Sequence, residues 1–418
     1  MSSKDIEVHI DFVQGPKRVG LLRRSPRRDG ETVTFEYDDA WLRDPARFSL
    51  EPALALTPGV FAPDRGFGIF GSIGDSAPDT WGRRLMQRAE RRLAQRESRA
   101  VRTLLEADYL LGVSDVSRLG ALRFKRAGEE TFQAPSKQGV PGVVELGRLL
   151  QVTERVLRDE DTDEDLQLIF APGSSLGGAR PKASVLDAKG RLAIAKFPKE
   201  TDDYSVELWK QIALMLAKQA GIEVPEHQLV RVADKPVLLS WRFDREKSTR
   251  VPFLSAMSMM ALRDGERSSY PELMEVLLEH GARATMDKTQ LYRRMVFNVL
   301  ISNVDDHLRN HGFLWRNRNG WMLAPAYDLN PTPTDLRQRI LTTRISLDEA
   351  TCDIELVRSV SEYFGLAIGE ADTVIGEVAR ATASWREVAG RAGAPKQEIE
   401  RMASAFDHDD LRQALTKA

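Results

Sequence analysis

The 418-residue sequence contains a single cysteine, Cys352, so a disulfide within the chain is impossible and a cysteine-based zinc site is not expected. No run of apolar residues approaches the roughly eighteen that a membrane-spanning helix needs. The N-terminal stretch MSSKDIEVHIDF also lacks the apolar core of a secretory signal. Together these absences indicate a cytoplasmic protein without a membrane partner.

An excess charge of one sign is missing as well, since 60 Lys and Arg oppose 62 Asp and Glu. No global field therefore attracts nucleic acid. Arginines do gather in a predicted helix over 83–102, which follows a helix-start signal in Asp75-Ser76-Ala77-Pro78-Asp79. This basic face is either solvated and partly balanced by Glu90 and Glu97, or a contact for an acidic partner.

The length is sufficient for two or three domains or lobes. Short apolar runs within 5–38, punctuated by Gly15-Pro16 and Asp29-Gly30, predict a small antiparallel meander. The polar, Gly- and Pro-containing stretch 126–142 is the best candidate for a linker. The acidic run 159–165 lacks the central glycine and terminal Glu of a calcium loop, and we expect a solvated turn there. We expect a β-rich N-terminal subdomain over 1–125, an N-lobe over 143–245 and a mostly helical C-lobe over 246–418.

Residues 301–332 carry the strongest functional signal, the pattern Asp305-x-His307-x-x-Asn310 followed, after a predicted hairpin, by Asp328. Phosphoryl transfer from a nucleotide needs a carboxylate beside the attacking hydroxyl and oxygen ligands for magnesium. We expect Asp305 to be the catalytic carboxylate and Asn310 and Asp328 to be the metal ligands. His307 would be a cation near the transferring phosphate. Asp306 ranks second, because only Asp305 has the five-residue spacing to Asn310.

A nucleotide site is predicted upstream. Gly177 and Gly178 would let backbone amides approach phosphates, although many Gly-Ser loops are only connectors. A hairpin follows and ends at Lys196, where a lysine on an apolar strand calls for an anion; alternatively, Lys196 leaves the strand into solvent. Glu207, early in the next helix, could pair with Lys196. The later stretch 241–243 would offer backbone groups to an adenine edge.

These motifs resemble the HipA family, the kinase components of bacterial type II toxin–antitoxin modules. The resemblance covers nearly the whole chain and is most specific in 173–332. Its matching segments are Ser175-Leu176-Gly177-Gly178-Ala179-Arg180-Pro181-Lys182, Ile194-Ala195-Lys196-Phe197-Pro198, Arg242-Phe243-Asp244-Arg245, Asp305-Asp306-His307-Leu308-Arg309-Asn310 and Ala326-Tyr327-Asp328-Leu329, with Phe70-Gly71-Ser72-Ile73-Gly74-Asp75-Ser76-Ala77-Pro78-Asp79 and Gly112-Val113-Ser114-Asp115 nearer the N-terminus.

The resemblance implies an α+β, two-lobed protein-kinase-like fold with an added N-terminal subdomain, and an ATP- and Mg²⁺-dependent serine/threonine protein kinase. Ser175, or the adjacent Ser174, would be phosphorylated by the kinase itself, which switches it off. Arg180 and Pro181 depart from the glutamine and glutamate of many members. The residues implied to bind ATP are Gly177, Gly178, Ala179, Arg180, Lys182, Lys196, Trp241, Phe243, His307, Asn310, Tyr327 and Asp328.

Family members commonly pair with a small helix-turn-helix antitoxin that binds DNA, and some phosphorylate aminoacyl-tRNA synthetases. The resemblance thus implies such a protein substrate, such an antitoxin, and DNA contact only through it, for which the helix over 83–102 is a possible surface. One alternative is a small-molecule phosphotransferase, which uses a similar Asp-to-Asn spacing. Another is a catalytically silent ATP-binding partner of a DNA-binding regulator, against which the intact Lys196, Asp305, Asn310 and Asp328 argue.

Overall fold

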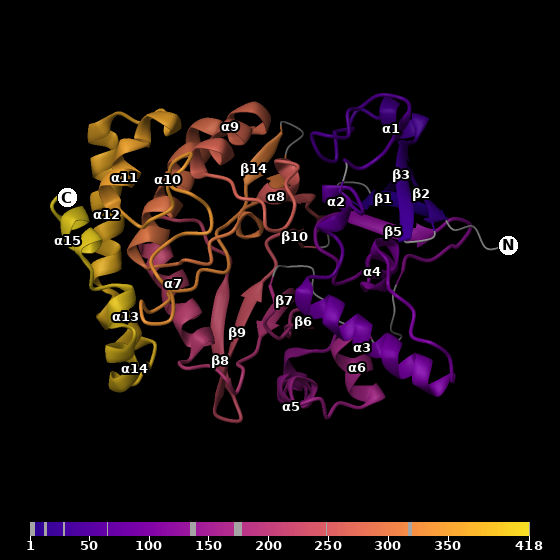
Figure 1. The fold of residues 1–418 in the computed structure, drawn as a ribbon, viewed down its shortest axis with the longest axis horizontal. Coiled ribbons are helices and arrows are strands. Elements are labelled where there is room, and N and C mark those ends of the chain that lie inside the picture. Colours follow the sequence, from indigo (N-terminus) through magenta and orange to yellow (C-terminus); the bar gives the residue numbers. More distant parts are fainter. Residues whose placement is uncertain are drawn as a thin grey trace. The chain divides into compact units, whose positions relative to one another are not determined.

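The computed structural model describes residues 5–11, 15–27, 30–64, 66–133, 139–170, 178–247, 249–316 and 320–417. The chain forms two compact units. Unit 1 consists of Met1–Glu200, Val232–Lys235 and Trp241–Arg263, and unit 2 of Thr201–Arg231, Pro236–Ser240 and Asp264–Ala418. The longest strands lie in the first half of the chain and most long helices in the second (Figure 1).

The N-terminal part of unit 1 is a five-stranded antiparallel sheet in the order β4-β3-β2-β1-β5. In β1, Ile6, Val8 and Ile10 are buried and alternate with more exposed residues, as the two-residue period of a strand requires. The predicted meander over 5–38 is confirmed. The strands are β1 (Ile6–Asp11), β2 (Pro16–Arg27), β3 (Gly30–Tyr37), β4 (Val60–Phe61) and β5 (Leu122–Arg126).

Helix α3 (Thr80–Arg96) is the longest helix of unit 1, and it lies beside α6 (Asp163–Phe170) (Figure 1). It begins where the sequence predicts, because Asp79 Oδ1 accepts a hydrogen bond of 2.9 Å from the Gly82 amide. The other helices of unit 1 are α1 (Asp39–Arg43), α2 (Gly71–Gly74), α4 (Glu106–Gly112), η1 (Val143–Glu145), α5 (Leu146–Leu157) and α8 (Ala256–Met259).

The acidic run covers part of the arginine face of α3. Asp161, whose side chain is 0% exposed, lies with Oδ1 2.7 Å from Arg88 Nε, and Asp163 Oδ2 lies 3.0 Å from Arg96 Nη1. The expectation of a solvated turn is therefore wrong at Asp161, since a buried carboxylate needs a cation and α3 provides two. Much of the basic face is neutralised within unit 1, so a partner is not needed to explain it.

A second buried charge network involves the segment Arg242-Phe243-Asp244-Arg245. Asp244 accepts hydrogen bonds from the Gly120 amide at 2.7 Å and from Arg242 Nε at 2.6 Å. Arg242 also donates to the Ser117 carbonyl at 2.8 Å. These residues join segments more than 120 positions apart in the sequence. The motif is thus part of the internal framework of unit 1.

The predicted hairpin before Lys196 is confirmed: β6 (Lys182–Leu186) pairs antiparallel with β7 (Leu192–Lys196), and Lys182 is the cross-strand partner of Lys196. Unit 1 also contains the short strands β10 (Arg245–Glu246), β11 (Thr249–Arg250) and β12 (Phe253–Ser255). Strands β8 (His227–Val232) and β9 (Lys235–Trp241) flank a turn at Ala233 and Asp234, both with positive φ.

The core of unit 2 surrounds α10 (Ala284–Leu300), which packs against α9 (Tyr270–His280) and α12 (Ile368–Ala383) (Figure 1). Leu291, Tyr292 and Phe297 of α10 are fully buried. Because this helix is held by packing, the segment that follows its end at Leu300 has a rigid base. The remaining elements are α7 (Val206–Gln219), η2 (Leu308–Asn310), β13 (Gly312–Trp315), β14 (Trp321–Leu323), α11 (Ile354–Ser359), η3 (Ser361–Phe364), α13 (Trp385–Arg391), α14 (Lys396–Arg401), η4 (Ala403–Ala405) and α15 (Asp409–Leu415).

Among the helices in the described ranges, none combines the length and the apolar character that crossing a bilayer requires.

Replacing Asp244 by Asn should lower the stability of the protein by about 3–5 kcal/mol, because two guanidinium groups lose their buried counter-charge. Burial alone would raise the pKa of Asp244, but Arg242 and Arg245 hold it at about 2. A depressed pKa means that the stabilisation is complete above the ordinary value of about 4 and is lost as the pH falls toward 2. Denaturant titrations should therefore show a wild-type advantage at pH 7 that shrinks below pH 4. The exposed control Asp39→Asn should leave the midpoint unchanged, and an equal midpoint for Asp244→Asn would contradict the assignment.

Candidate functional site

The segment after α10 places two adjacent carboxylates in opposite environments. The side chain of Asp305 is 56% exposed, whereas that of Asp306 is 3% exposed. Asp305 lies near one cation, Arg337, with Nη1 3.4 Å from Oδ1, and both side chains of this pair are largely exposed. An exposed pair of this kind is weak. Asp305 is therefore the carboxylate that an incoming molecule can reach.

Asp306 holds this segment in place through buried hydrogen bonds. Tyr270 donates a hydrogen bond of 2.5 Å to Oδ2, and His311 Nε2 lies 3.0 Å from Oδ1. The Asp306 carbonyl accepts from the amide and the hydroxyl of Thr343 at 2.9 and 2.7 Å. Burial would raise the pKa of Asp306, but the charge of His311 and these hydrogen bonds hold it below its usual value. Asp306 is thus a structural anion. The sequence offered both Asp305 and Asp306 as the catalytic carboxylate, and their different environments now distinguish them.

A chain of side-chain amides extends this anchor. Tyr270 Oη accepts from Asn298 Nδ2 at 2.9 Å, and Asn303 Nδ2 donates to Asn298 Oδ1 at 3.0 Å. Asn303 Oδ1 then accepts from the Asn330 amide at 3.2 Å. This network connects α9 and α10 to the residue two positions after Asp328. The two predicted motifs of unit 2 are consequently held in one framework.

Asn310 has the arrangement expected of a metal ligand. Its Nδ2 donates to the Asp305 carbonyl at 3.1 Å, and its amide donates to the His307 carbonyl at 2.7 Å. Within the described ranges its Oδ1 is buried and has no hydrogen-bond partner, and the same holds for His307 Nδ1. A buried acceptor without a partner is costly. Oxygen atoms are the ligands that Mg²⁺ prefers, so a bound cation would satisfy Asn310.

Asp328 sits in a strained backbone position, with φ of 59°. Such left-handed conformations in residues other than glycine cost energy and are common at functional sites. The Asp328 carboxylate accepts a hydrogen bond of 2.5 Å from Lys210 Nζ in α7. Tyr327, the preceding residue, donates to the Arg309 carbonyl at 2.6 Å, which holds η2 beside this segment. The residues Asn310 and Asp328 therefore offer the oxygen donors that Mg²⁺ prefers.

Lys210 is a site residue that the sequence analysis missed. It is buried on α7, a helix whose buried residues are otherwise almost all apolar. A lysine on such a face needs a buried anion. The sequence shows this lysine among apolar residues. It does not show the partner, because Asp328 lies 118 positions away.

In unit 1 the described part of the glycine loop is held by α3. Gly178 has φ of 108°, and its carbonyl accepts from the Trp81 amide and from Lys182 Nζ, both at 3.3 Å. Ala179 is exposed and Arg180 is half-buried. Lys196 is half-buried at the end of β7. The predicted residues Ser174, Ser175 and Gly177 lie outside the described residues.

Two residues expected near adenine make contacts within unit 1. Trp241 Nε1 donates to Asp187 Oδ2 at 2.9 Å, and Phe243 packs against Phe253 with ring centroids 6.2 Å apart. The Arg242 amide donates to the Leu192 carbonyl at 3.0 Å. The expectation that 241–243 offers its backbone to adenine is therefore wrong for the amide of Arg242, because a neighbouring strand already uses it.

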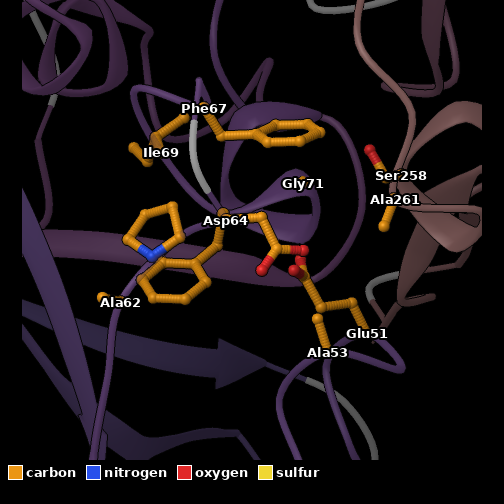
Figure 2. A pocket seen from close by; sticks show the side chains of 11 residues that line it. Glu51, Ala53, Ala62, Asp64, Phe67, Ile69, Gly71, Ser258 and Ala261 are labelled. Atoms are coloured by element: carbon orange, nitrogen blue, oxygen red, sulfur yellow. The ribbon is translucent and has the colours of Figure 1, made fainter.

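A small pocket of unit 1 contains none of the predicted nucleotide residues (Figure 2). Phe67, Ile69 and Asp64 line it together with Glu51. Glu51 is committed to the start of α2, since Oε2 accepts a hydrogen bond of 2.5 Å from the Ser72 amide. The Glu51 carboxylate of this pocket is thus part of the local framework.

Comparison with known proteins identifies the larger part of the chain. A family model described as the HipA-like C-terminal domain matches residues 174–406. A Haemophilus influenzae protein named "Putative kinase" is 23% identical over 232 residues, which are 49% of this chain and 67% of that protein. The Sinorhizobium fredii protein Y4mE, also named as a kinase, is 24% identical over 77% of this chain and 78% of its own length. Y4dM of the same organism is 31% identical, over 33% of this chain and 37% of its own length.

A solved structure has a similar fold over nearly the whole chain. It is described as the Shewanella oneidensis toxin–antitoxin system of HipA, HipB and operator DNA, with a TM-score of 0.69 and 18% identity. The match covers 99% of this chain and 96% of the Shewanella chain. The predicted fold class, α+β and HipA-like with a kinase-like architecture, is confirmed.

The two adjacent aspartates should respond differently to the same substitution. Asp306→Asn should lower the melting temperature clearly, because the buried cluster with Tyr270 and His311 loses its charge, at a cost of about 3–5 kcal/mol. Asp305→Asn should leave the melting temperature within a degree or two, because its carboxylate faces solvent. Thermal unfolding of the two purified variants measures this. Equal melting temperatures would refute the division of roles.

Proposed function

This chain belongs to the family of proteins with a HipA-like C-terminal domain, and on that premise we propose that it is an ATP- and Mg²⁺-dependent serine/threonine protein kinase. The observation that carries the proposal is the arrangement of three groups in unit 2. They are the exposed carboxylate of Asp305, the buried oxygen of Asn310 that has no described hydrogen-bond partner, and the carboxylate of Asp328, whose backbone has a φ of 59°. Phosphoryl transfer needs this set of a hydroxyl-orienting carboxylate and two metal ligands.

Each residue has a distinct role in the proposed reaction. Asp305 orients the acceptor hydroxyl and accepts its proton as the γ-phosphoryl group leaves ATP. Asn310 and Asp328 hold Mg²⁺, which offsets the negative charge of the phosphates. His307, whose Nδ1 is buried without a described partner, would interact with the transferring group. Lys210 keeps Asp328 oriented through its hydrogen bond of 2.5 Å.

Unit 1 supplies the groups that bind the nucleotide in this proposal. Lys196 pairs with phosphate oxygens, and the glycine loop through Gly178, Ala179 and Arg180 covers them with backbone amides. Glycine suits this role because no side chain blocks the approach. Ser175, or Ser174, is the expected site of self-phosphorylation.

The proposal extends to a partner and a substrate. The similar Shewanella chain was solved with HipB and operator DNA. We infer a helix-turn-helix antitoxin as partner here too, with DNA contacted through that partner and the chain acting as the toxin. A protein hydroxyl is the acceptor, and an aminoacyl-tRNA synthetase is the first candidate to test.

Purified protein should transfer phosphate from ATP to a protein substrate in the presence of Mg²⁺, and Asp305→Asn should reduce the rate by about 10²–10⁴-fold through loss of the general base. Phosphoproteomics of cells expressing either form would identify the acceptor. Asp328→Asn should raise the Mg²⁺ concentration needed for half-maximal rate, a shift that Asp305→Asn should not cause. Transfer to small alcohols but to no protein would instead favour a small-molecule phosphotransferase. No transfer to any acceptor would favour a silent ATP-binding protein.

Incubation with Mg²⁺ and ATP should place a phosphate on Ser175, detectable by peptide mass spectrometry, and lower the subsequent kinase rate. A phosphoserine carries close to two negative charges, which the phosphates of ATP would repel. Ser175→Ala should prevent both changes, whereas Ser174→Ala serves as the matched control and should prevent neither. Unchanged self-phosphorylation in Ser175→Ala would reassign the site.

A further inference from the structure

The beginning of α3 and the end of the glycine loop meet through one buried ion pair. Lys182 Nζ donates a hydrogen bond of 2.7 Å to Asp79 Oδ2. Asp79 uses its other oxygen to accept from the Gly82 amide at 2.9 Å, which caps the helix. The carbonyl of Gly178 accepts from Lys182 Nζ and from the Trp81 amide. Four residues of two distant segments thus fix where the loop joins β6.

Burial makes this contact stronger than a surface pair. The side chains of Asp79 and Lys182 are each 3% exposed. Removing one member of a buried pair leaves an uncompensated charge, which is costly. The pair holds Lys182 beside α3, and Lys182 Nζ donates in turn to the Gly178 carbonyl, so the pair restricts the positions in which Gly178 keeps this hydrogen bond.

The pair also shapes the charge around Lys196. Lys182 and Lys196 are direct cross-strand partners in the hairpin of β6 and β7. Side chains at such positions share one face of the hairpin and lie close together, and two like charges there destabilise each other. Asp79 offsets the charge of Lys182, which makes it possible to place a second lysine opposite it.

We propose that Asp79 is a positioning residue for nucleotide binding, which acts through Lys182 and Gly178 to hold the end of the glycine loop against α3. This inference rests on the proposed function, in which the loop and Lys196 bind the phosphates of ATP. It assigns a role to the motif Asp75-Ser76-Ala77-Pro78-Asp79, which lies outside the kinase-like part of the chain. In this proposal the segment that contains Asp79 contributes to the affinity for the nucleotide.

The test compares variants that separate the cap from the ion pair. Asn at position 79 still caps a helix well, so Asp79→Asn removes the charge and keeps the cap. The double variant Asp79→Asn with Lys182→Met leaves no unpaired buried charge and should recover stability lost by the single variant. Asp163→Asn is the control, because it removes the more exposed pair with Arg96 at the far end of the same helix.

Binding is measured by titrating each full-length protein with a fluorescent ATP analogue, alongside the KM for ATP, kcat and the melting temperature. The Kd and KM of Asp79→Asn should rise at least tenfold, with kcat at saturating ATP within about twofold of wild type. The double variant should also show a Kd at least tenfold higher than wild type, and its kcat is not compared, because Lys182 is itself implied to bind ATP. Asp163→Asn should bind like wild type. The expected split between KM and kcat would not arise if Asp79 served only to support the fold.

Two outcomes would overturn the inference, and they are distinguishable. If wild type and the folded double variant bind the analogue equally, Asp79 and Lys182 do not position the loop, and the proposed function stands. If wild type itself binds no nucleotide, the proposed function fails and this inference fails with it.

Discussion

The buried carboxylate of Asp306 is the point on which the chemistry of unit 2 depends. Tyr270 donates a hydrogen bond to one carboxylate oxygen, and His311 Nε2 lies close to the other. The backbone carbonyl of Asp306 accepts a hydrogen bond from the Thr343 hydroxyl. With these contacts made, the chain at 305–310 has little freedom, so the exposed carboxylate of Asp305 and the oxygen of Asn310 take defined positions. The buried charge of Asp306 thus fixes the position of its neighbour, the carboxylate that we propose as catalytic.

Unit 1 also contains buried carboxylates that hold segments in place, and there their partners are mostly arginines. Asp161 and Asp244 are buried carboxylates that bind segments distant in the sequence. Asp161 pairs with Arg88 and Arg92 of α3. Asp244 pairs with its neighbours Arg242 and Arg245 and accepts a hydrogen bond from the distant Gly120 amide. Such pairs contribute little net stability compared with apolar packing, but breaking them is expensive. They therefore serve to specify which segments meet. The Asp79–Lys182 pair is a further buried ion pair, and it lies at the end of the glycine loop. In the proposed function, the position of this loop would also affect how tightly ATP binds.

Family and fold class were within reach of the sequence because they rest on short motifs and on periodicity. The spacing from Asp305 to Asn310, the hairpin that ends at Lys196 and the meander over 5–38 are local patterns, and the structure or the family match bears out the hairpin, the meander and the family. The expectation that 241–243 offers backbone groups to adenine was wrong for the Arg242 amide, because this amide donates to the Leu192 carbonyl, a partner that only the folded chain reveals. The solvated turn expected at Asp161 was wrong because its partners lie on α3, some seventy residues earlier.

What the sequence by itself determined was therefore the list of chemically able residues: Asp305, Asn310, Asp328, Lys196 and the glycine pair. Their types and spacings are properties of the chain alone. What the tertiary structure decided was which of them are accessible and which are committed. It assigned Asp306 to the framework and Lys210 to Asp328, and it bound Lys182 to Asp79. The physical reason is that exposure and electrostatic pairing arise between residues far apart in sequence, and those encounters exist only once the chain has folded.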